Sequence, residues 1–179
     1  SKMTHLVSQI VRFEAALDAD APLSEVLPSI YRAHKERYRG YTIRQLCQEM
    51  HNFYKSLNVK ELQKEMFRKA HFPKRAMEPQ VAHFEFMRGN VDSVPLEEAA
   101  GRISTEGALP YPPGVLCVVP GEVWGDSVLK YFLALEEGIN RFPGFAPELQ
   151  GVYIEKGEDG RSRAFGHVLS REREKELGL

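Results

Sequence analysis

The sequence predicts an α+β domain with a helical first half, followed by a strand, a helix and a hairpin. Up to about residue 69, apolar residues recur at spacings of three and four, which is typical of helices. From Ala108 onward, runs rich in β-branched residues are bracketed by proline and glycine, which is typical of strands between turns. The 179 residues are 42% hydrophobic and 27% charged, enough to form the core of one domain.

The first predicted helix places four apolar side chains on one face, namely Leu6, Ile10, Phe13 and Leu17. Pro22 ends it, and Pro28 makes the segment 23–31 irregular or kinked. Thr42 and Gln45 match a capping box, which predicts the start of a helix there. That helix carries an apolar stripe of Leu46, Met50, Phe53 and Tyr54.

Another helix is expected over about 59–69, whereas residues 76–89 fit either a helix or a strand. Ser93 before Pro95 predicts a short helix that carries Leu96, Ala99, Ala100 and Ile103. The apolar run 115–119 lies between proline–glycine turns and predicts a buried strand.

Asp126 is expected to cap a helix that ends at Pro143 and buries Leu129, Phe132, Leu133, Leu135 and Ile139. Residues 152–154 and 164–168 flank a glycine-containing turn and predict a hairpin. The last ten residues are charged, and we expect them to be solvated or frayed.

Charge and composition exclude several classes of protein. With 24 basic and 25 acidic residues, the chain has no excess of positive charge for general nucleic-acid binding. No apolar run reaches the roughly 20 residues that cross a membrane. Cys47 and Cys117 lack metal-site spacing and lie among apolar residues, so reduced, buried thiols in a cytoplasmic protein are expected.

No motif of a self-contained active site is present: the chain lacks a nucleophile elbow, a zinc-protease helix, a dinucleotide fingerprint and a phosphate loop. The six histidines lie in unrelated contexts, which favours packing or surface positions over metal binding. We therefore assign no catalytic, cofactor-binding or metal-binding residue.

The segment 105–114 is different, because three prolines and two glycines force a stiff path with sharp turns. Three polar side chains lie around it: Glu106, Tyr111 and Glu122. The two carboxylates either belong to the wall of a pocket or channel that attracts a cation, or only cap and pair where the prolines shape the path into the strand. Both interpretations remain open.

The run 108–122, ALPYPPGVLCVVPGE, resembles the carboxy-terminal domain of the ornithine/lysine/arginine decarboxylase family. Shorter similarities occur in the same order as in the family, at 27–31, 43–46, 97–103 and 143–145. The resemblance extends from about Leu6 to Tyr153. Residues 106–108 and 114–119 are more similar to ornithine decarboxylases than to the lysine or arginine enzymes.

The resemblance implies that residues 1–20 are the last helix of an aminotransferase-like small subdomain and that residues 21–179 are the decarboxylase carboxy-terminal domain. Complete enzymes of this family bind pyridoxal phosphate through a lysine and are cytoplasmic dimers that often assemble further. Because the chain opens on Ser1 within a helical pattern, we expect a cut through a longer polypeptide rather than a processed end.

The family's cofactor lysine follows the pattern Ser-x-His-Lys, and residues 33–35 read Ala-His-Lys. Position 32 is Arg instead of Ser, and the segment lies well past the family's cofactor site, so we interpret the match as a coincidence. The chain is therefore not expected to hold pyridoxal phosphate.

By resemblance, the chain would pack on the cofactor-binding core of an enzyme that converts ornithine to putrescine and carbon dioxide, within a homo-oligomer, and would be inactive alone. Glu106 and Glu122 are the candidates for pairing with the distal ammonium of ornithine, with Tyr111 supporting either of them. The alternative is a purely structural or assembly domain of a lysine or arginine decarboxylase without substrate contact.

Overall fold

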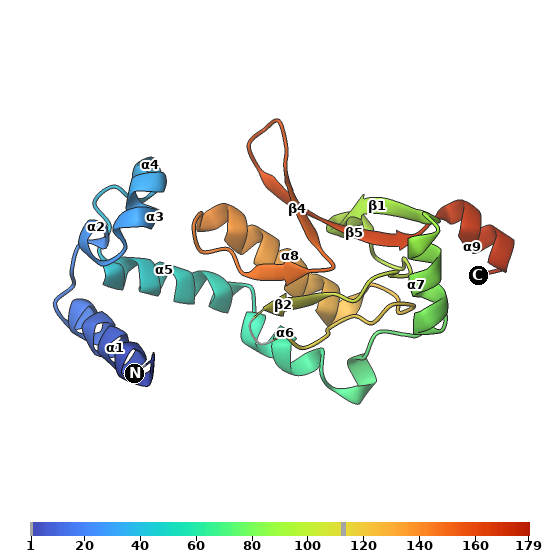
Figure 1. The fold of residues 1–179 in the computed structure, drawn as a ribbon, viewed down its shortest axis with the longest axis horizontal. Coiled ribbons are helices and arrows are strands. Elements are labelled where there is room, and N and C mark those ends of the chain that lie inside the picture. Colours follow the sequence, from blue (N-terminus) through green and yellow to red (C-terminus); the bar gives the residue numbers. More distant parts are fainter. Residues whose placement is uncertain (1, 112–113) are drawn as a thin grey trace. The chain divides into compact units, whose positions relative to one another are not determined.

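The computed structural model describes residues 2–111 and 114–179, and the chain divides into two compact units, residues 1–56 and 57–179 (Figure 1). The described part contains helices and antiparallel strands, so the predicted α+β class is confirmed. None of its helices is both long and apolar enough to cross a membrane.

The first unit is helical: α1 (Lys2–Asp18), α2 (Leu23–Val26), α3 (Pro28–Ala33), α4 (Lys35–Tyr38) and α5 (Ile43–Ser56). The predicted capping box is confirmed, because Gln45 Oε1 accepts from the Thr42 N–H at 3.1 Å and Thr42 Oγ1 accepts from the Gln45 N–H at 3.2 Å. The Arg44 guanidinium donates to the Leu17 carbonyl at 2.7 Å and ties α5 to the end of α1. The fully buried apolar side chains of this unit are Leu23, Tyr38, Ile43 and Leu46.

The second unit contains four α-helices among the described residues: α6 (Val59–Glu65), α7 (Pro79–Met87), α8 (Asp126–Arg141) and α9 (Arg171–Leu177). The strands β1 (Val91–Pro95), β5 (Ser162–Leu169) and β4 (Tyr153–Lys156) form an antiparallel sheet in that order. A second, two-stranded sheet pairs β2 (Leu109–Tyr111) with β3 (Glu148–Gln150). Single 3-10 turns occur at Lys69–His71 and Leu96–Glu98.

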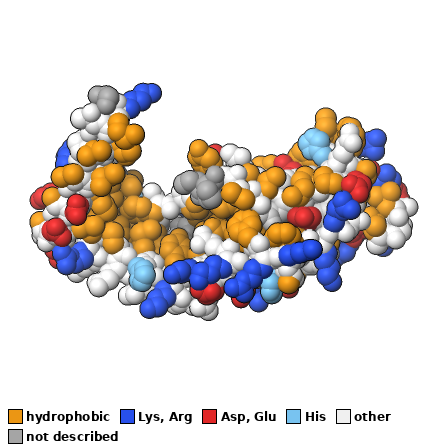
Figure 2. Space-filling model, turned by 90° about the horizontal axis from the view of Figure 1, so that it is seen from below, with side chains coloured by type: hydrophobic (Ala, Val, Ile, Leu, Met, Phe, Trp, Pro, Cys, Tyr) orange, Lys and Arg blue, Asp and Glu red, His pale blue; other side chains and the backbone are white. Residues whose placement is uncertain are grey.

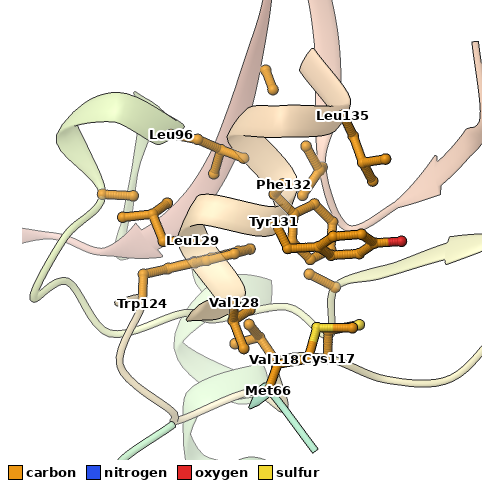
Figure 3. Close-up of a cluster of buried hydrophobic side chains, with 14 of the residues drawn as sticks. Met66, Leu96, Cys117, Val118, Trp124, Val128, Leu129, Tyr131, Phe132 and Leu135 are labelled. Atoms are coloured by element: carbon orange, nitrogen blue, oxygen red, sulfur yellow. The ribbon is translucent and has the colours of Figure 1, made fainter. Parts of the chain in front are cut away.

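Helix α8 forms the centre of this unit's core, as Figure 3 shows. The rings of Trp124 and Phe132 meet edge to face with their centroids 5.5 Å apart. Met66, Leu96 and Val118 pack around them from other segments. Phe132 is fully buried, as predicted, and the predicted hairpin is confirmed by the pairing of β4 with β5.

The predicted buried strand over 115–119 is wrong. Val115 and Leu116 are exposed, and within the run only Val118 forms a bridge, with Ala108. Gly114 has a φ of +80°, and the N–H groups of both Cys117 and Val118 donate to the Ala108 carbonyl. The run therefore curls around Ala108 rather than extending beside a neighbour.

The predicted helix starting at Ser93 is also wrong, because Val91–Pro95 pairs with β5 and only a single 3-10 turn follows. Strand β1 lies at the edge of its sheet, where a proline without an N–H is tolerated. Residues 76–89, which the sequence left open, contain the helix α7.

Three smaller expectations are corrected. Asp126 is the first residue of α8 and makes no capping hydrogen bond, since the N-cap position is Gly125. The last ten residues are not frayed, because Ser170 caps α9 and Arg173 pairs with the buried Glu85. Both cysteines are free, as expected, but only Cys117 is buried, whereas Cys47 is half-buried.

Candidate functional site

The backbone around Glu106 is held between two other segments of the chain. On one side, the Ser104 N–H donates to the Glu122 carbonyl at 2.8 Å, and the Gly121 N–H donates to the Ser104 carbonyl at 2.7 Å. On the other side, the N–H and the hydroxyl of Thr105 both donate to the His167 carbonyl, at 3.1 and 3.0 Å. Since Ser104 and Thr105 are buried, the position of Glu106 is fixed by its neighbours.

The Glu106 carboxylate contacts two side chains that are far away in the sequence. His167 Nδ1 lies 2.6 Å from Glu106 Oε2, and the Tyr153 hydroxyl lies 2.9 Å from Oε1 and 3.1 Å from Oε2. An ionised carboxylate can only accept hydrogen bonds, so in that state Nδ1 of His167 carries the hydrogen. Glu106, His167 and Tyr153 form one hydrogen-bonded group, which we call the Glu106 cluster.

The two sheets explain how these residues meet. The β2–β3 register pairs Leu109 with Gln150, and continuing it by three residues brings Glu106 opposite Tyr153. Tyr153 then pairs with Phe165 in β5, and His167 lies two residues further along the same face of that strand. The next residue, Val168, points to the opposite face and is buried in the core.

Aromatic rings enclose part of the cluster. The His167 ring lies 4.9 Å from the Tyr153 ring and 5.4 Å from the ring of Phe86 on α7, measured between centroids. Partial burial, followed by the hydrogen bond to Glu106 and its charge, raises the pKa of the Tyr153 hydroxyl. The hydroxyl therefore keeps its hydrogen and serves as a donor. The side chain of Glu106 remains 18% exposed and that of His167 remains 26% exposed, so the carboxylate is still accessible.

Glu122 has a different environment. Its carboxylate oxygen Oε2 accepts from the Val119 N–H at 2.8 Å, three residues earlier, which closes a local turn. Its backbone also pairs with Ser104 and bridges to Arg75. Within the described residues, this geometry is that of a turn cap, and the side chain is not joined to Glu106.

Tyr111 is 53% exposed at the end of β2, where it pairs with Glu148. We expected Tyr111 to support either Glu106 or Glu122; in the part of the chain that the structure describes, the tyrosine that donates to Glu106 is Tyr153. Pro112 and Pro113, which belong to the predicted stiff path, lie outside the described residues.

The sequence thus suggested Glu106 as a candidate but did not reveal its two partners, Tyr153 and His167. Tyr153 was assigned only to a hairpin strand, and His167 was grouped with the other histidines. The available signal was the alternation along 164–168, which places His167 on the face opposite the apolar core residues. The pairing across about 60 residues is a tertiary contact that no local pattern contains.

The described residues contain no group of three or more His, Cys, Asp or Glu side chains that could hold a metal ion. Lys35 is exposed on the single-turn helix α4. Such a solvated position does not fit a lysine that would carry a buried cofactor, in agreement with its interpretation as a coincidental match.

Residues 60–170 match the family model described as "Orn/Lys/Arg decarboxylase, C-terminal domain". The chain is 64% identical over 169 residues to the inducible ornithine decarboxylase of Escherichia coli, covering 94% of this chain but 23% of that protein. It is 58% identical over 170 residues to the ornithine decarboxylase of Haemophilus influenzae, covering 95% of this chain and 24% of that protein.

Among solved structures, lysine decarboxylase A from Pseudomonas aeruginosa matches with a TM-score of 0.84 at 32% identity. That match covers 95% of this chain and 23% of the other. The chain therefore spans about a quarter of the length of each of these relatives.

Proposed function

The chain belongs to the Orn/Lys/Arg decarboxylase C-terminal domain family, and on that premise we propose that it is the carboxy-terminal domain of a pyridoxal-phosphate-dependent ornithine decarboxylase. In this role it contributes to the active-site entrance and to subunit packing of a cytoplasmic homo-oligomer that forms putrescine, and it is inactive alone. The choice of ornithine is supported by 64% and 58% identity to ornithine decarboxylases, against 32% to a lysine decarboxylase.

The observation that carries a role in substrate recognition is the set of side chains that contact the Glu106 carboxylate. Among the described residues, no Lys or Arg pairs with the Glu106 carboxylate, whose contacts are a tyrosine hydroxyl and a histidine nitrogen. A partly buried carboxylate that has no permanently charged Lys or Arg partner attracts a cation. The distal ammonium of ornithine is a cation of suitable kind, and we assign Glu106 as its partner.

Glu122 and Tyr111 remain in the proposal with lesser roles. The Val119 N–H donates to one oxygen of Glu122, and we propose that the other oxygen faces a substrate channel. Tyr111 is exposed at the end of β2, and Val115 and Leu116, a few residues later in the sequence, are exposed as well. We propose that this apolar surface faces the cofactor-binding core, where a substrate channel would pass.

Pyridoxal phosphate supplies the electron sink for decarboxylation in such an enzyme. Because Lys35 is exposed and unsuited to hold it, we propose that the cofactor-binding residues belong to the core rather than to these 179 residues. The contribution of this chain is then to bind and orient the end of the substrate that does not react.

The test is steady-state kinetics of Glu106→Gln in the full-length decarboxylase. Losing a charge-assisted contact should raise KM for ornithine, or lower kcat/KM, by about tenfold or more. Glu122→Gln should have a smaller effect, and Glu158→Gln, at the exposed hairpin turn, serves as the control. Unchanged kinetics for both Glu106→Gln and Glu122→Gln would leave the chain without a substrate contact.

That outcome would favour the second candidate, a purely structural or assembly domain, which has its own supporting observation. Helix α1 contains no buried residue, and its exposed apolar side chains include Leu6, Val7, Ile10, Val11 and Phe13. A groove of about 550 Å³ within the first unit lies along this helix. It is lined by the apolar Ile10, Phe13, Ala16, Ala21, Val26 and Leu27 together with Gln9, Arg12 and Glu25. Figure 2 shows hydrophobic side chains over much of the surface in view.

We propose that residues 1–20 are the last helix of the small subdomain and pack their apolar face on the enzyme core. Ile10→Ser combined with Phe13→Ser should then weaken assembly of the full-length protein, measured by light scattering after size-exclusion chromatography. An unchanged assembly would remove α1 from the packing surface.

A further inference from the structure

The Glu106 carboxylate is held by more contacts than an ordinary surface carboxylate needs. Two donors from different strands reach the same side chain, with Tyr153 on β4 and His167 on β5. The backbone of each donor is fixed: Tyr153 pairs with Phe165, and the His167 carbonyl accepts two hydrogen bonds from Thr105. The carboxylate is therefore held from outside its own segment.

A glutamate side chain has three rotatable bonds, and ordering it costs conformational entropy. When the surrounding protein has already ordered the carboxylate, a ligand does not have to do so on binding. An ionised carboxylate offers about four acceptor positions, and the two donors of the cluster leave some of them for an ammonium group, which has three N–H donors.

The nature of the donors matters as much as their number. A tyrosine hydroxyl donates a hydrogen bond without positive charge, and histidine, unlike lysine or arginine, is not a permanent cation. A lysine or arginine in the same place would hold the carboxylate equally well but would compete electrostatically with an incoming ammonium.

We propose that His167 and Tyr153 are positioning residues that hold the Glu106 carboxylate in one orientation for the terminal ammonium of a diamino acid. This inference rests on the proposed function, because it requires Glu106 to contact the substrate. It makes selectivity for the ammonium a property of the whole cluster and not of Glu106 alone.

The experiment uses the full-length decarboxylase and compares two ligands in each variant. Ornithine is measured by its KM, and norvaline, which has the same carbon skeleton without the distal ammonium, by its inhibition constant. The ratio of the norvaline inhibition constant to the ornithine KM reports recognition of the ammonium, and a general loss of structure affects both constants together.

The variants separate the roles of the three residues. Glu106→Gln should lower the ratio about tenfold or more, whereas Tyr153→Phe and His167→Leu, which each remove one donor, should lower it about three- to tenfold. His167→Asn retains a side-chain N–H donor close to the position of Nδ1 and should recover much of the ratio. Two controls should leave the ratio unchanged: His51→Asn, an exposed histidine on α5, and Tyr131→Phe, whose hydroxyl accepts from Gln63 in another part of the second unit.

The outcomes distinguish the inference from the proposed function. If Glu106→Gln lowers the ratio but Tyr153→Phe and His167→Leu do not, the positioning role is overturned and the substrate role of Glu106 stands. If Glu106→Gln leaves the ratio unchanged, Glu106 does not recognise the ammonium, and the positioning role is overturned with it. Should His167→Leu fail to fold, Tyr153→Phe and His167→Asn decide the matter, because each changes few atoms.

Discussion

The two units of the chain bury their side chains very differently. In residues 1–56, α1 contributes no buried side chain, and the buried apolar set is Leu23, Tyr38, Ile43 and Leu46. In residues 57–179, α8 alone buries nine residues, and the core around it draws side chains from several helices and strands. A unit with so little buried apolar surface gains little from the hydrophobic effect.

This difference indicates which part of the chain carries its own stability. The second unit has the packing of an independent core, and the Glu106 cluster is built entirely on it. The first unit exposes an apolar helix face that, in our proposal, another part of the enzyme covers.

Each unit contains one cysteine, and the largest expected difference between the units is in the reactivity of these two thiols. Cys117 is buried in the second unit, and burial raises its pKa to about 11, whereas Cys47 is half-buried in the first. The native chain should therefore react with a thiol reagent at Cys47 at least about a hundredfold faster than at Cys117. Stopped-flow kinetics with Cys47→Ser and Cys117→Ser variants assigns each phase, and equal rates would contradict the contrast.

The next effect concerns stability. Phe132→Ala removes a fully buried ring from the centre of the second unit and should lower its free energy of unfolding by about 3–5 kcal/mol. Trp124 is the only tryptophan in the chain and lies in the same core, so its fluorescence during urea unfolding reports this unit. Leu46→Ala in the first unit should leave the Trp124 transition in place, and a matching shift there would show that the units unfold together.

A smaller effect is expected from the charged side chains that hold α9 on the second unit. Arg173 donates to both oxygens of Glu85, which is 2% exposed, and Asn90 donates to it as well. Hydrogen bonds from Arg173 and then Asn90 lower the pKa of Glu85 in the folded chain. This stabilisation is complete above the unfolded-state pKa of about 4.5 and is lost as the pH falls through the folded-state pKa.

Arg173→Met should therefore destabilise the chain at neutral pH, by less than Phe132→Ala, and should make its stability less dependent on pH in the acid range. Urea unfolding at a series of pH values measures both the stability and its pH dependence.

Glu136 provides the opposite case, because burial raises its pKa in the folded chain. The stabilisation that Glu136 contributes is therefore present at low pH and is lost as the pH rises through the folded-state pKa. Glu136→Gln should thus gain stability relative to the parent chain as the pH rises, and parallel curves would contradict this assignment.

The smallest effect should come from the exposed face of α1. Ile10→Ser in the 179-residue chain should change the free energy of unfolding by less than about 0.5 kcal/mol, because the side chain is already exposed. Circular dichroism during thermal unfolding measures this. A loss comparable to that of Phe132→Ala would mean that α1 is packed within the chain itself, and the contrast between the units would fail.

Several elements could be predicted because their signals are local. The capping box at Thr42 and Gln45, the irregular segment after Pro22 and the hairpin around Gly157 each depend on neighbouring residues. The strand predicted over 115–119 is absent because β-branched residues only favour an extended backbone. A strand also needs the exposed edge of another strand with which to pair. Here the Ala108 carbonyl accepts two N–H groups of the run and bends it.

The same distinction applies to the candidate site. Glu106 could be proposed because it adjoins a segment of unusual composition, but Tyr153 and His167 reach it only through the pairing of β2 with β3 and of β4 with β5.

Helix α9 was not predicted for a related reason. Its charges suggest a solvated end, yet Arg173 pairs with Glu85, 88 residues earlier, and the sequence gives no local sign of that partner.

In our proposal, this chain recognises part of a substrate but does not hold the cofactor. The most direct measurement mixes the purified chain with pyridoxal phosphate and ornithine and records the cofactor absorbance spectrum together with carbon dioxide release. We predict neither a specific Schiff-base band nor decarboxylation. A specific band that Lys35→Ala abolishes would contradict the account, because the exposed Lys35 would then be a cofactor lysine and the chain would not depend on a separate core.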